Sequence, residues 1–174
     1  VGERREQSKR QRRHAEEQEQ LRAKLQEDVE RFRRLVESFE DIVWEVNAQG
    51  QYTYVSPKVK KVLGYDPDEL IGQTPFELMP LSEAGQAVHF FQIVFEKRLP
   101  FAGLQNVYLR KDGSRIILER SAAPVFDSQG VFRGFQGVDR DITARRWAED
   151  ELRMTSRYSR LLMEQANVAD IDQE

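Results

Sequence analysis

Two different spacings of apolar residues divide the chain. Residues 3–39 contain neither Gly nor Pro and are rich in Glu, Arg, Gln and Lys, which favours one long helix. Its apolar stripe follows a seven-residue repeat: Leu25, Val29, Phe32, Val36 and Phe39. One helix cannot bury so narrow a stripe alone, so a homodimer through this N-terminal helix is predicted. Upstream, the stripe becomes polar at Gln18 and Arg22, where the pairing is expected to loosen.

Beyond Asp41, apolar and polar residues alternate with a period of two, the spacing of half-buried strands. The alternation predicts strands at 42–47, 51–55, 103–110, 115–125 and 131–142. Short helical turns are predicted where a polar N-cap residue precedes Pro, at Ser56-Pro57, Asp66-Pro67 and Thr74-Pro75. Ser82 is expected to cap a longer helix that ends near residue 98. This order predicts an α+β fold, an antiparallel sheet with short helices on one face.

The chain from residue 144 onward again lacks Gly and Pro, and Thr143 is expected to cap a second long helix. A seven-residue spacing there predicts a second coiled seam at Trp147, Met154, Leu161 and Val168. We divide the chain into an N-terminal coiled-coil helix at 1–39, a domain at 40–143 and a C-terminal helix at 144–174. The segment 157–162 parallels 31–36, which indicates a connector to a following module or a chance likeness of two amphipathic helices.

The composition narrows the class of protein. Charged residues make up 33% and hydrophobic residues 39% of the chain, yet the net charge is only −3, so no nucleic-acid partner is expected. The chain has no cysteine, which excludes disulfides and thiolate chemistry. No apolar run approaches the ~20 residues of a membrane span, so a cytoplasmic location is expected. The basic cluster in residues 4–13 is a solvated helix face or a stretch just inside a membrane in a longer parent protein.

No catalytic or metal-binding set is visible. His14 lies among charged residues, and His89 lies on an apolar helix, where a core role is expected. Asp66, Asp68 and the acidic run 149–151 occupy helix starts or an exposed helix, where they favour the dipole or the solvent. The segment is therefore not expected to be an enzyme.

Several short motifs occur in an order that resembles the PAS domain family. They are Asn47-x-x-Gly50, Tyr54-Val55-Ser56-Pro57, Leu63-Gly64-Tyr65, Glu69-Leu70-Ile71-Gly72, Arg110-Lys111-Asp112-Gly113, Asp127-x-x-Gly130 and Asp141-Ile142-Thr143. The resemblance implies a five-stranded antiparallel sheet whose inner face encloses a pocket. It also implies a sensory domain of the kind found in bacterial sensor kinases and diguanylate cyclases, with an output domain following in the same chain.

The resemblance leaves the cofactor unknown. Light-oxygen-voltage (LOV) members form a flavin adduct with a cysteine, which this chain lacks. Flavin-binding redox members carry a Trp where this chain has Phe101. The position of the haem-binding His in some members falls nearer Ala84 than His89. Flavin and haem are therefore not expected. We expect either a small organic acid or no ligand in the core.

An ungapped alignment with LOV-type members predicts which side chains face the pocket. The expected ligand-binding residues are Trp44, Val46, Phe91, Asn106, Tyr108, Leu118, Arg120, Phe135 and Asp139. Arg120 and Asp139 lie on adjacent strands, and a buried charge is costly unless it is paired. Two hypotheses follow: an internal ion pair closes a small or empty core, or Arg120 binds a small anion that Asp139 orients.

The strand-to-helix junction is the expected exit for a signal. Asp141, four residues before Arg145, is predicted to pair with it, and Thr143 to cap the helix. The favoured function is a ligand-binding sensor that signals through the C-terminal helix. The alternative is a ligand-free dimerisation and relay spacer, which a solidly packed core would favour.

Overall fold

The computed structural model describes the backbone of residues 2–171 and the side chains of residue 10 and residues 12–161. The chain forms two compact units, residues 1–40 and 41–174. Val168 of the predicted C-terminal seam, and most of the predicted connector at 157–174, lie outside the described side chains.

The first unit is a single helix, α1 (Gly2–Ser38). Most of its predicted apolar stripe is exposed to solvent, including Leu25, Val29 and Phe32. Val36 is the exception, at 5% exposure.

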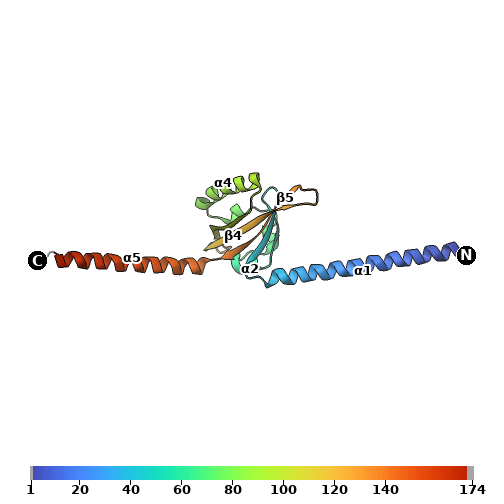
Figure 1. Ribbon diagram of the computed structural model, residues 1–174, viewed down its shortest axis with the longest axis horizontal. Helices are drawn as coiled ribbons and strands as arrows, with labels where there is room; N and C mark the ends of the chain where they lie inside the picture. Colours follow the sequence, from blue (N-terminus) through green and yellow to red (C-terminus); the bar gives the residue numbers. More distant parts are fainter. Residues whose placement is uncertain (1, 172–174) are drawn as a thin grey trace. The chain divides into compact units, whose positions relative to one another are not determined.

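The second unit is built on a five-stranded antiparallel sheet in the order β2-β1-β5-β4-β3 (Figure 1). The strands are β1 (Ile42–Asn47), β2 (Tyr52–Val55), β3 (Phe101–Leu109), β4 (Arg115–Phe126) and β5 (Phe132–Asp141). Between β2 and β3 lie α2 (Lys58–Leu63), α3 (Pro67–Leu70), the 3₁₀ turn η1 (Pro75–Leu78) and α4 (Leu81–Lys97). The predicted α+β architecture is confirmed, and β5 is the central strand, between β1 and β4.

Local chemistry explains the three short helical turns. Gly64 ends α2 in the left-handed conformation (φ 83°), which glycine adopts without steric cost. Asp66 begins α3 and Thr74 begins η1, each with a capping box. In a capping box the side chain of the first residue accepts from the backbone N–H three residues on, and the glutamate at that position accepts from the backbone N–H of the first residue.

Ser56 and Ser82 do not have the predicted capping roles. Pro57 precedes α2 and Pro80 precedes α4. Ser56 is buried, and its hydroxyl instead accepts a hydrogen bond from the Val43 N–H at 3.0 Å. This bond fastens the segment that directly follows β2 to the neighbouring strand β1.

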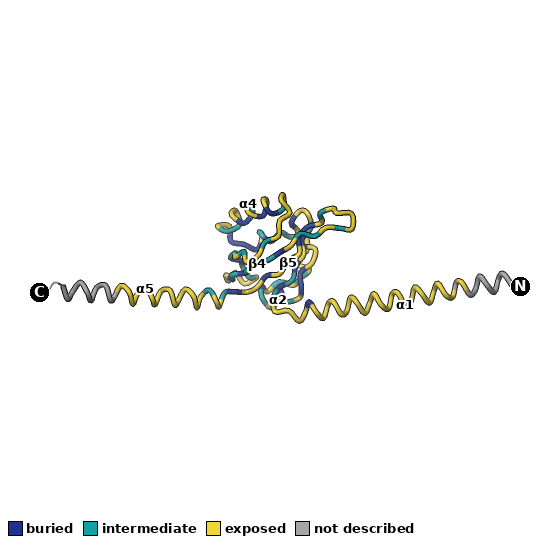
Figure 2. The backbone as a smooth tube through the Cα atoms, in the orientation of Figure 1, coloured by how far each residue is buried: buried dark blue, intermediate teal, exposed yellow. Residues whose placement is uncertain are grey.

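The core lies between the inner face of the sheet and the helices, where buried residues concentrate (Figure 2). Trp44, Tyr108 and Phe135 from the sheet are almost wholly buried there, and Phe91 enters from α4. Edge-to-face contacts link Phe91 to Phe76 and Phe101, with centroids 5.4 and 5.5 Å apart. The aromatic residues thus fill much of the space between the sheet and the helices.

The unit continues into α5 (Thr143–Ile171). Large apolar side chains remain exposed on this helix, namely Trp147, Leu152, Met154, Tyr158 and Leu161. Among the helices within the described part of the chain, none combines the length and apolar character needed to cross a membrane.

Candidate functional site

An ion pair between Arg120 and Asp139 occupies the centre of the core. The antiparallel register of β4 and β5 places these two residues directly opposite each other. Arg120 Nε donates to Asp139 Oδ1 at 2.7 Å, and Nη2 donates to Oδ2 at 2.6 Å. This bidentate arrangement uses the planar fork of the guanidinium and is among the strongest geometries for a charged pair.

Two residues of the β1–β2 hairpin complete the network. Trp44 Nε1 donates to Asp139 Oδ1 at 2.7 Å, and Arg120 Nη2 donates to the Tyr52 hydroxyl at 3.1 Å. The guanidinium carbon also lies 4.5 Å from the centroid of the Trp44 ring and 5.3 Å from that of Tyr108. Aromatic faces therefore stabilise the cation in addition to the carboxylate.

Both charged side chains are removed from solvent, with 1% exposure for Arg120 and 3% for Asp139. Burial by itself acts to lower the pKa of Arg120. The attraction of the Asp139 carboxylate, the interactions with Tyr108 and Tyr52 and the hydrogen bond to Asp139 together outweigh burial, and the pKa lies well above its ordinary value. Burial raises the pKa of Tyr52, and it raises that of Tyr108 further. Near neutral pH the Arg120 side chain is thus charged and the two phenols are neutral.

Some polar atoms of this core have no protein partner. Within the described part of the chain, the buried atoms without one are Arg120 Nη1, the Tyr108 hydroxyl and Asn106 Oδ1. Leaving such a group unpaired costs about 1–3 kcal/mol, so each is a place where a small polar molecule would be stabilised.

A small cavity adjoins Arg120. Its volume is about 20 Å³, which suffices for roughly one water molecule. Ligand pockets for drug-sized molecules are typically about 300–1,000 Å³, so neither flavin nor haem fits this arrangement of side chains. Larger hollows of about 830 Å³ along α5 and 500 Å³ along α1 are open grooves on single helices. In the described residues, no group of three or more His, Asp or Glu side chains could hold a metal ion.

The structure places the predicted site residues in one core, but only some of them line the cavity. Those that line it are Trp44, Val46, Phe91, Arg120 and Phe135. Asn106, Tyr108, Leu118 and Asp139 lie outside its lining. The alternation missed Gly50, Pro75, Phe76, Phe95 and Phe101, which also line it. It missed Tyr52 as a partner of Arg120 too; the inward position of Tyr52, opposite Val46 in the β1–β2 pair, was the available signal.

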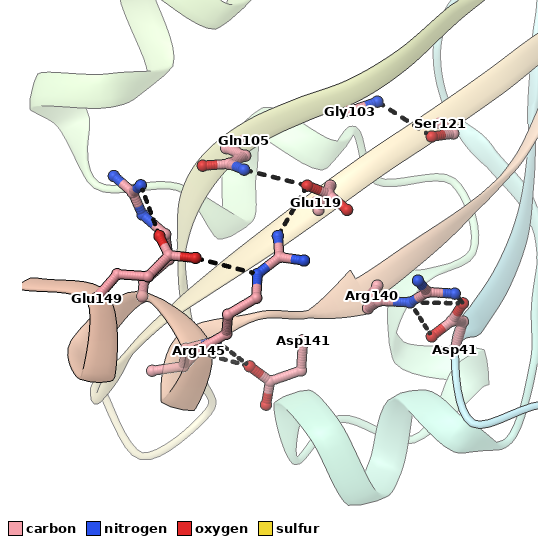
Figure 3. Close-up of polar contacts among 11 residues, drawn as sticks. Asp41, Gly103, Gln105, Glu119, Ser121, Arg140, Asp141, Arg145 and Glu149 are labelled. Atoms are coloured by element: carbon pink, nitrogen blue, oxygen red, sulfur yellow. Dashed lines mark hydrogen bonds and ion pairs between the residues drawn. The ribbon is translucent and has the colours of Figure 1, made fainter.

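The end of β5 carries a second set of polar contacts (Figure 3). Arg140 forms a forked pair with Asp41, at 2.9 Å from Nη2 to Oδ2. Asp141 Oδ1 accepts from the backbone N–H of Thr143 at 2.9 Å and from its hydroxyl at 2.6 Å. Asp141 Oδ2 lies 3.7 Å from Arg110 Nη2. The carboxylate therefore holds the first turn of α5 against the sheet.

Two predictions about this junction are wrong. Asp141 does not pair with Arg145, because Arg145 Nη2 instead reaches Glu119 of β4 at 3.0 Å (Figure 3). Thr143 does not cap α5 either, since it is the first helical residue and its hydroxyl accepts from the Ile117 N–H at 3.0 Å. Both side chains tie α5 to β4, and Arg145 Nε also lies 3.9 Å from Glu149 Oε1 within the helix.

Glu119 is the anchor of the second tie. Gln105 Nε2 donates to its Oε2 at 3.0 Å, the same oxygen that accepts from Arg145. The bond from Gln105 lowers the pKa of Glu119, partial desolvation opposes this, and Arg145 lowers it further. The outer face of β4 thereby holds a carboxylate that stays charged under mildly acidic conditions.

The five-stranded sheet cups an inner core and continues through β5 into the exit helix α5. A family model described as "PAS domain" matches residues 40–144. The chain belongs to the PAS domain family, and the resemblance seen in its motifs is confirmed.

Similar curated proteins include a fungal receptor and a bacterial kinase. The chain is 30% identical over 97 residues to the blue light receptor lreA of Aspergillus flavus, covering 51% of this chain and 11% of that protein. It is 27% identical over 119 residues to sporulation kinase C of Bacillus subtilis, covering 68% of this chain and 27% of that protein. The chain thus spans a small part of the curated relatives it matches.

Solved structures agree on the fold. The PAS domain of an HTR-like protein from Haloarcula marismortui has a TM-score of 0.60 at 24% identity, covering 71% of this chain and 99% of that one. The N-terminal domain of a diguanylate cyclase with a PAS/PAC sensor from Marinobacter aquaeolei has a TM-score of 0.56 at 19% identity, with coverages of 61% and 98%.

Proposed function

We propose that this chain relays a signal from its closed PAS core through β5 to α5. The observation that supports the proposal is the environment of three consecutive residues of β5. Asp139 holds the core ion pair, Arg140 pairs with Asp41, and Asp141 binds the first residue of α5. Because side chains alternate along a strand, one backbone segment contacts the core, the outer face and the exit helix. A shift of β5 driven from the core would therefore change all three contacts together.

The neighbouring strand β4 provides a second connection between the core and α5. On β4, Arg120 belongs to the core network, whereas Ile117 and Glu119 hold α5 through Thr143 and Arg145. The Ile142 N–H also donates to the Ile117 carbonyl at 3.0 Å. Relative movement of β4 and β5 thus has a direct mechanical connection to the start of α5.

The receiver of the signal is proposed to be an output domain elsewhere in the same protein. Sporulation kinase C and the diguanylate cyclase combine a domain similar to this one with activities named in their descriptions. By analogy, we expect a bacterial-type signalling protein of the kinase or diguanylate cyclase kind, acting in the cytoplasm. The chain itself supplies the sensory and relay part.

The relay is tested by hydrogen exchange of the intact chain carrying Asp139→Asn. This variant leaves the Arg120 charge without its counterion, so we expect faster exchange in the first two turns of α5, residues 143–150, as well as in the core. Leu70→Ala is the matched control, because Leu70 is a buried residue of α3, which packs mainly against β2. Its substitution destabilises the same unit without touching the proposed route.

The exchange rates of Asp139→Asn and Leu70→Ala at the start of α5 decide between a relay through β5 and a general loss of stability. If Asp139→Asn accelerates exchange in residues 143–150 no more than an equally destabilising Leu70→Ala, the relay through β5 is refuted. Asp141→Ala provides the converse test. It should accelerate exchange at the start of α5 while leaving the fluorescence of the buried Trp44 unchanged.

Ligand binding in the core is a second candidate function, supported by the unpaired Arg120 Nη1 beside the cavity. Asp139 already balances the charge of Arg120, so a neutral molecule with one acceptor oxygen fits this atom better than the organic acid expected from the sequence. The cavity holds roughly one water molecule, so binding of a larger molecule requires the surrounding side chains to move. Thermal melting with short ketones and alcohols, compared with their carboxylic acids, tests this candidate. Equal or stronger stabilisation by the acids would reject the preference for a neutral ligand.

A further inference from the structure

A groove between the end of α2 and the β3–β4 turn combines a concave surface with an excess of positive charge. Its volume is about 490 Å³, and it is lined by residues 61–64 and 110–112. The lining contains three cationic side chains, Lys61, Arg110 and Lys111, and one carboxylate, Asp112. The groove therefore has the charge that would attract a small anion.

Arg110 is fixed in this groove by one of its three guanidinium nitrogens. Its Nε donates to the Val62 carbonyl at 2.9 Å, and its backbone N–H donates to the Ser114 carbonyl across the turn at 2.8 Å. The two terminal nitrogens are held less closely: Nη1 lies 3.4 Å from Ser114 Oγ, and Nη2 lies 3.7 Å from Asp141 Oδ2. Charge-assisted hydrogen bonds are about 2.7–2.9 Å long, so both terminal nitrogens remain able to bind a better-placed anion.

The other charged residues of the groove differ in how they are engaged. Lys111 Nζ is held by the Glu69 carboxylate at 2.6 and 2.7 Å, which fastens the turn to α3. Asp112 Oδ1 accepts from a backbone N–H of its own turn at 2.8 Å. Lys61 is exposed, and the described part of the chain contains no ion-pair partner for it. Lys61 and the terminal nitrogens of Arg110 are thus the positive groups available to an anion.

Arg110 also connects the groove to the exit helix. Its Nη2 pairs with Asp141 Oδ2, while Oδ1 of the same carboxylate accepts from the backbone N–H and the hydroxyl of Thr143, the first residue of α5. An anion that binds Nη2 competes with Asp141 for one positive charge. The anion therefore weakens the contact between Arg110 and Asp141, and the charge of Asp141 weakens binding of the anion to the same extent.

We infer that this groove binds the dianion of a small phosphate monoester, held by Lys61 and by both terminal nitrogens of Arg110. A phosphate monoester carries about −1.5 to −2 charges at pH 7 and has three strong acceptor oxygens, so it neutralises both cations at once. Binding draws Arg110 away from Asp141 and loosens the first turn of α5. This last step deepens the proposed relay by giving α5 an input separate from the core; the binding site itself does not rest on that relay.

NMR amide chemical shifts of the intact chain test the site. Methyl phosphate is titrated near pH 7 at an ionic strength held constant with NaCl. The amides of Gly64 and Asp112, which line the groove, should shift along a saturable curve. Lys61→Gln removes one exposed charge and should raise the Kd roughly fivefold. Lys97→Gln, a matched control in the last turn of α4 and outside the groove, should leave the Kd unchanged.

Three results would overturn the site. The amide shifts of Gly64 and Asp112 could fail to saturate, or Lys97→Gln could weaken binding as much as Lys61→Gln. The third result is retention of the chain on vesicles that contain phosphatidic acid without any response to dissolved methyl phosphate. That result would assign the basic groove to a lipid headgroup instead of a small molecule.

A further variant tests the competition for Arg110. Asp141→Asn keeps an oxygen that can accept from Thr143 but removes the competing charge, so it should lower the Kd for methyl phosphate roughly two- to fivefold. In the wild-type chain, saturating methyl phosphate should accelerate hydrogen exchange in residues 143–146 relative to NaCl alone. An unchanged Kd in Asp141→Asn, or unchanged exchange in residues 143–146, would overturn the competition. Neither measurement uses Asp139→Asn, the variant that tests the relay through β5, so the two proposals fail independently.

Discussion

Removing the positive partner of the buried pair should destabilise the domain strongly. Arg120→Met keeps an apolar side chain of similar length but removes both hydrogen bonds to Asp139. The carboxylate then stays in a site with 3% exposure, with the Trp44 N–H as its remaining side-chain donor. Breaking a buried pair in this way costs about 3–5 kcal/mol. Small domains have unfolding free energies of about 5–15 kcal/mol, so the loss is a large fraction of the total.

The second substitution separates a charge effect from a packing effect. Asp139→Asn, made in the Arg120→Met background, removes the uncompensated charge and keeps an oxygen that can accept from Trp44. The double variant should regain at least half of the lost free energy, because neutral replacements of buried ion pairs are often tolerated. The remaining deficit comes from an amide whose donors lack partners, about 1–3 kcal/mol.

Urea unfolding followed by tryptophan fluorescence measures both effects. Trp44 lies against Arg120 in the core, whereas Trp147 is 70% exposed, so the emission change reports mainly on the core. At a slope of about 2 kcal/mol per molar urea, the midpoint of Arg120→Met should fall by on the order of 2 M. Protein concentration must be held constant, because dimerisation would shift the apparent stability.

Two results would refute this account of the core. A loss below 1 kcal/mol for Arg120→Met would mean that water or a rearrangement compensates Asp139. A double variant as unstable as the single one would mean that lost packing against the aromatic rings, and not the stranded charge, dominates.

Other perturbations test close packing and the tie to α5. Gly137→Ala should lower the free energy of unfolding by several kcal/mol, because an added Cβ would lie 2.6 Å from the Trp44 ring. Its control, Gly85→Ala in the open part of α4, should raise the free energy of unfolding by about 0.5–1 kcal/mol in the same urea assay. The pKa of Glu119 is lowered in the folded state. Its stabilising contribution is therefore complete above the unfolded-state pKa of about 4.3 and is lost as pH falls through the lower folded-state value. Hydrogen exchange in the first turn of α5 should rise across that acidic window, and Glu119→Gln should remove this pH dependence. A transition that persists in Glu119→Gln would assign the effect to another carboxylate.

Much of the core was accessible from strand alternation. A period of two fixes which side of a strand each residue faces, and hairpin turns fix which residues lie opposite. The ungapped alignment with LOV-type members of the family set which side faces inward and so placed Arg120 and Asp139 together, and the structure brings them into contact. The same reasoning could not show that the pair would close the space, since cavity volume depends on aromatic side chains from α4, η1 and β3.

The junction shows where local patterns mislead. A spacing of four suggested a pair between Asp141 and Arg145, as in an exposed helix. Asp141, however, precedes the helix, and its carboxylate is occupied by Thr143. Arg145 therefore takes the carboxylate of Glu119 on β4.

By itself, the sequence determined the elements, their order, the PAS family and the heptad face of α1, because these depend on spacing along the chain. The tertiary structure alone decided that Trp44 and Tyr52, distant in sequence from Arg120, complete its network and that little space remains beside it. It also decided that α5 is tied to β4. Such contacts depend on how strands and helices pack in three dimensions. A polar side chain pairs with the nearest unoccupied partner in space, which need not be the nearest one in sequence.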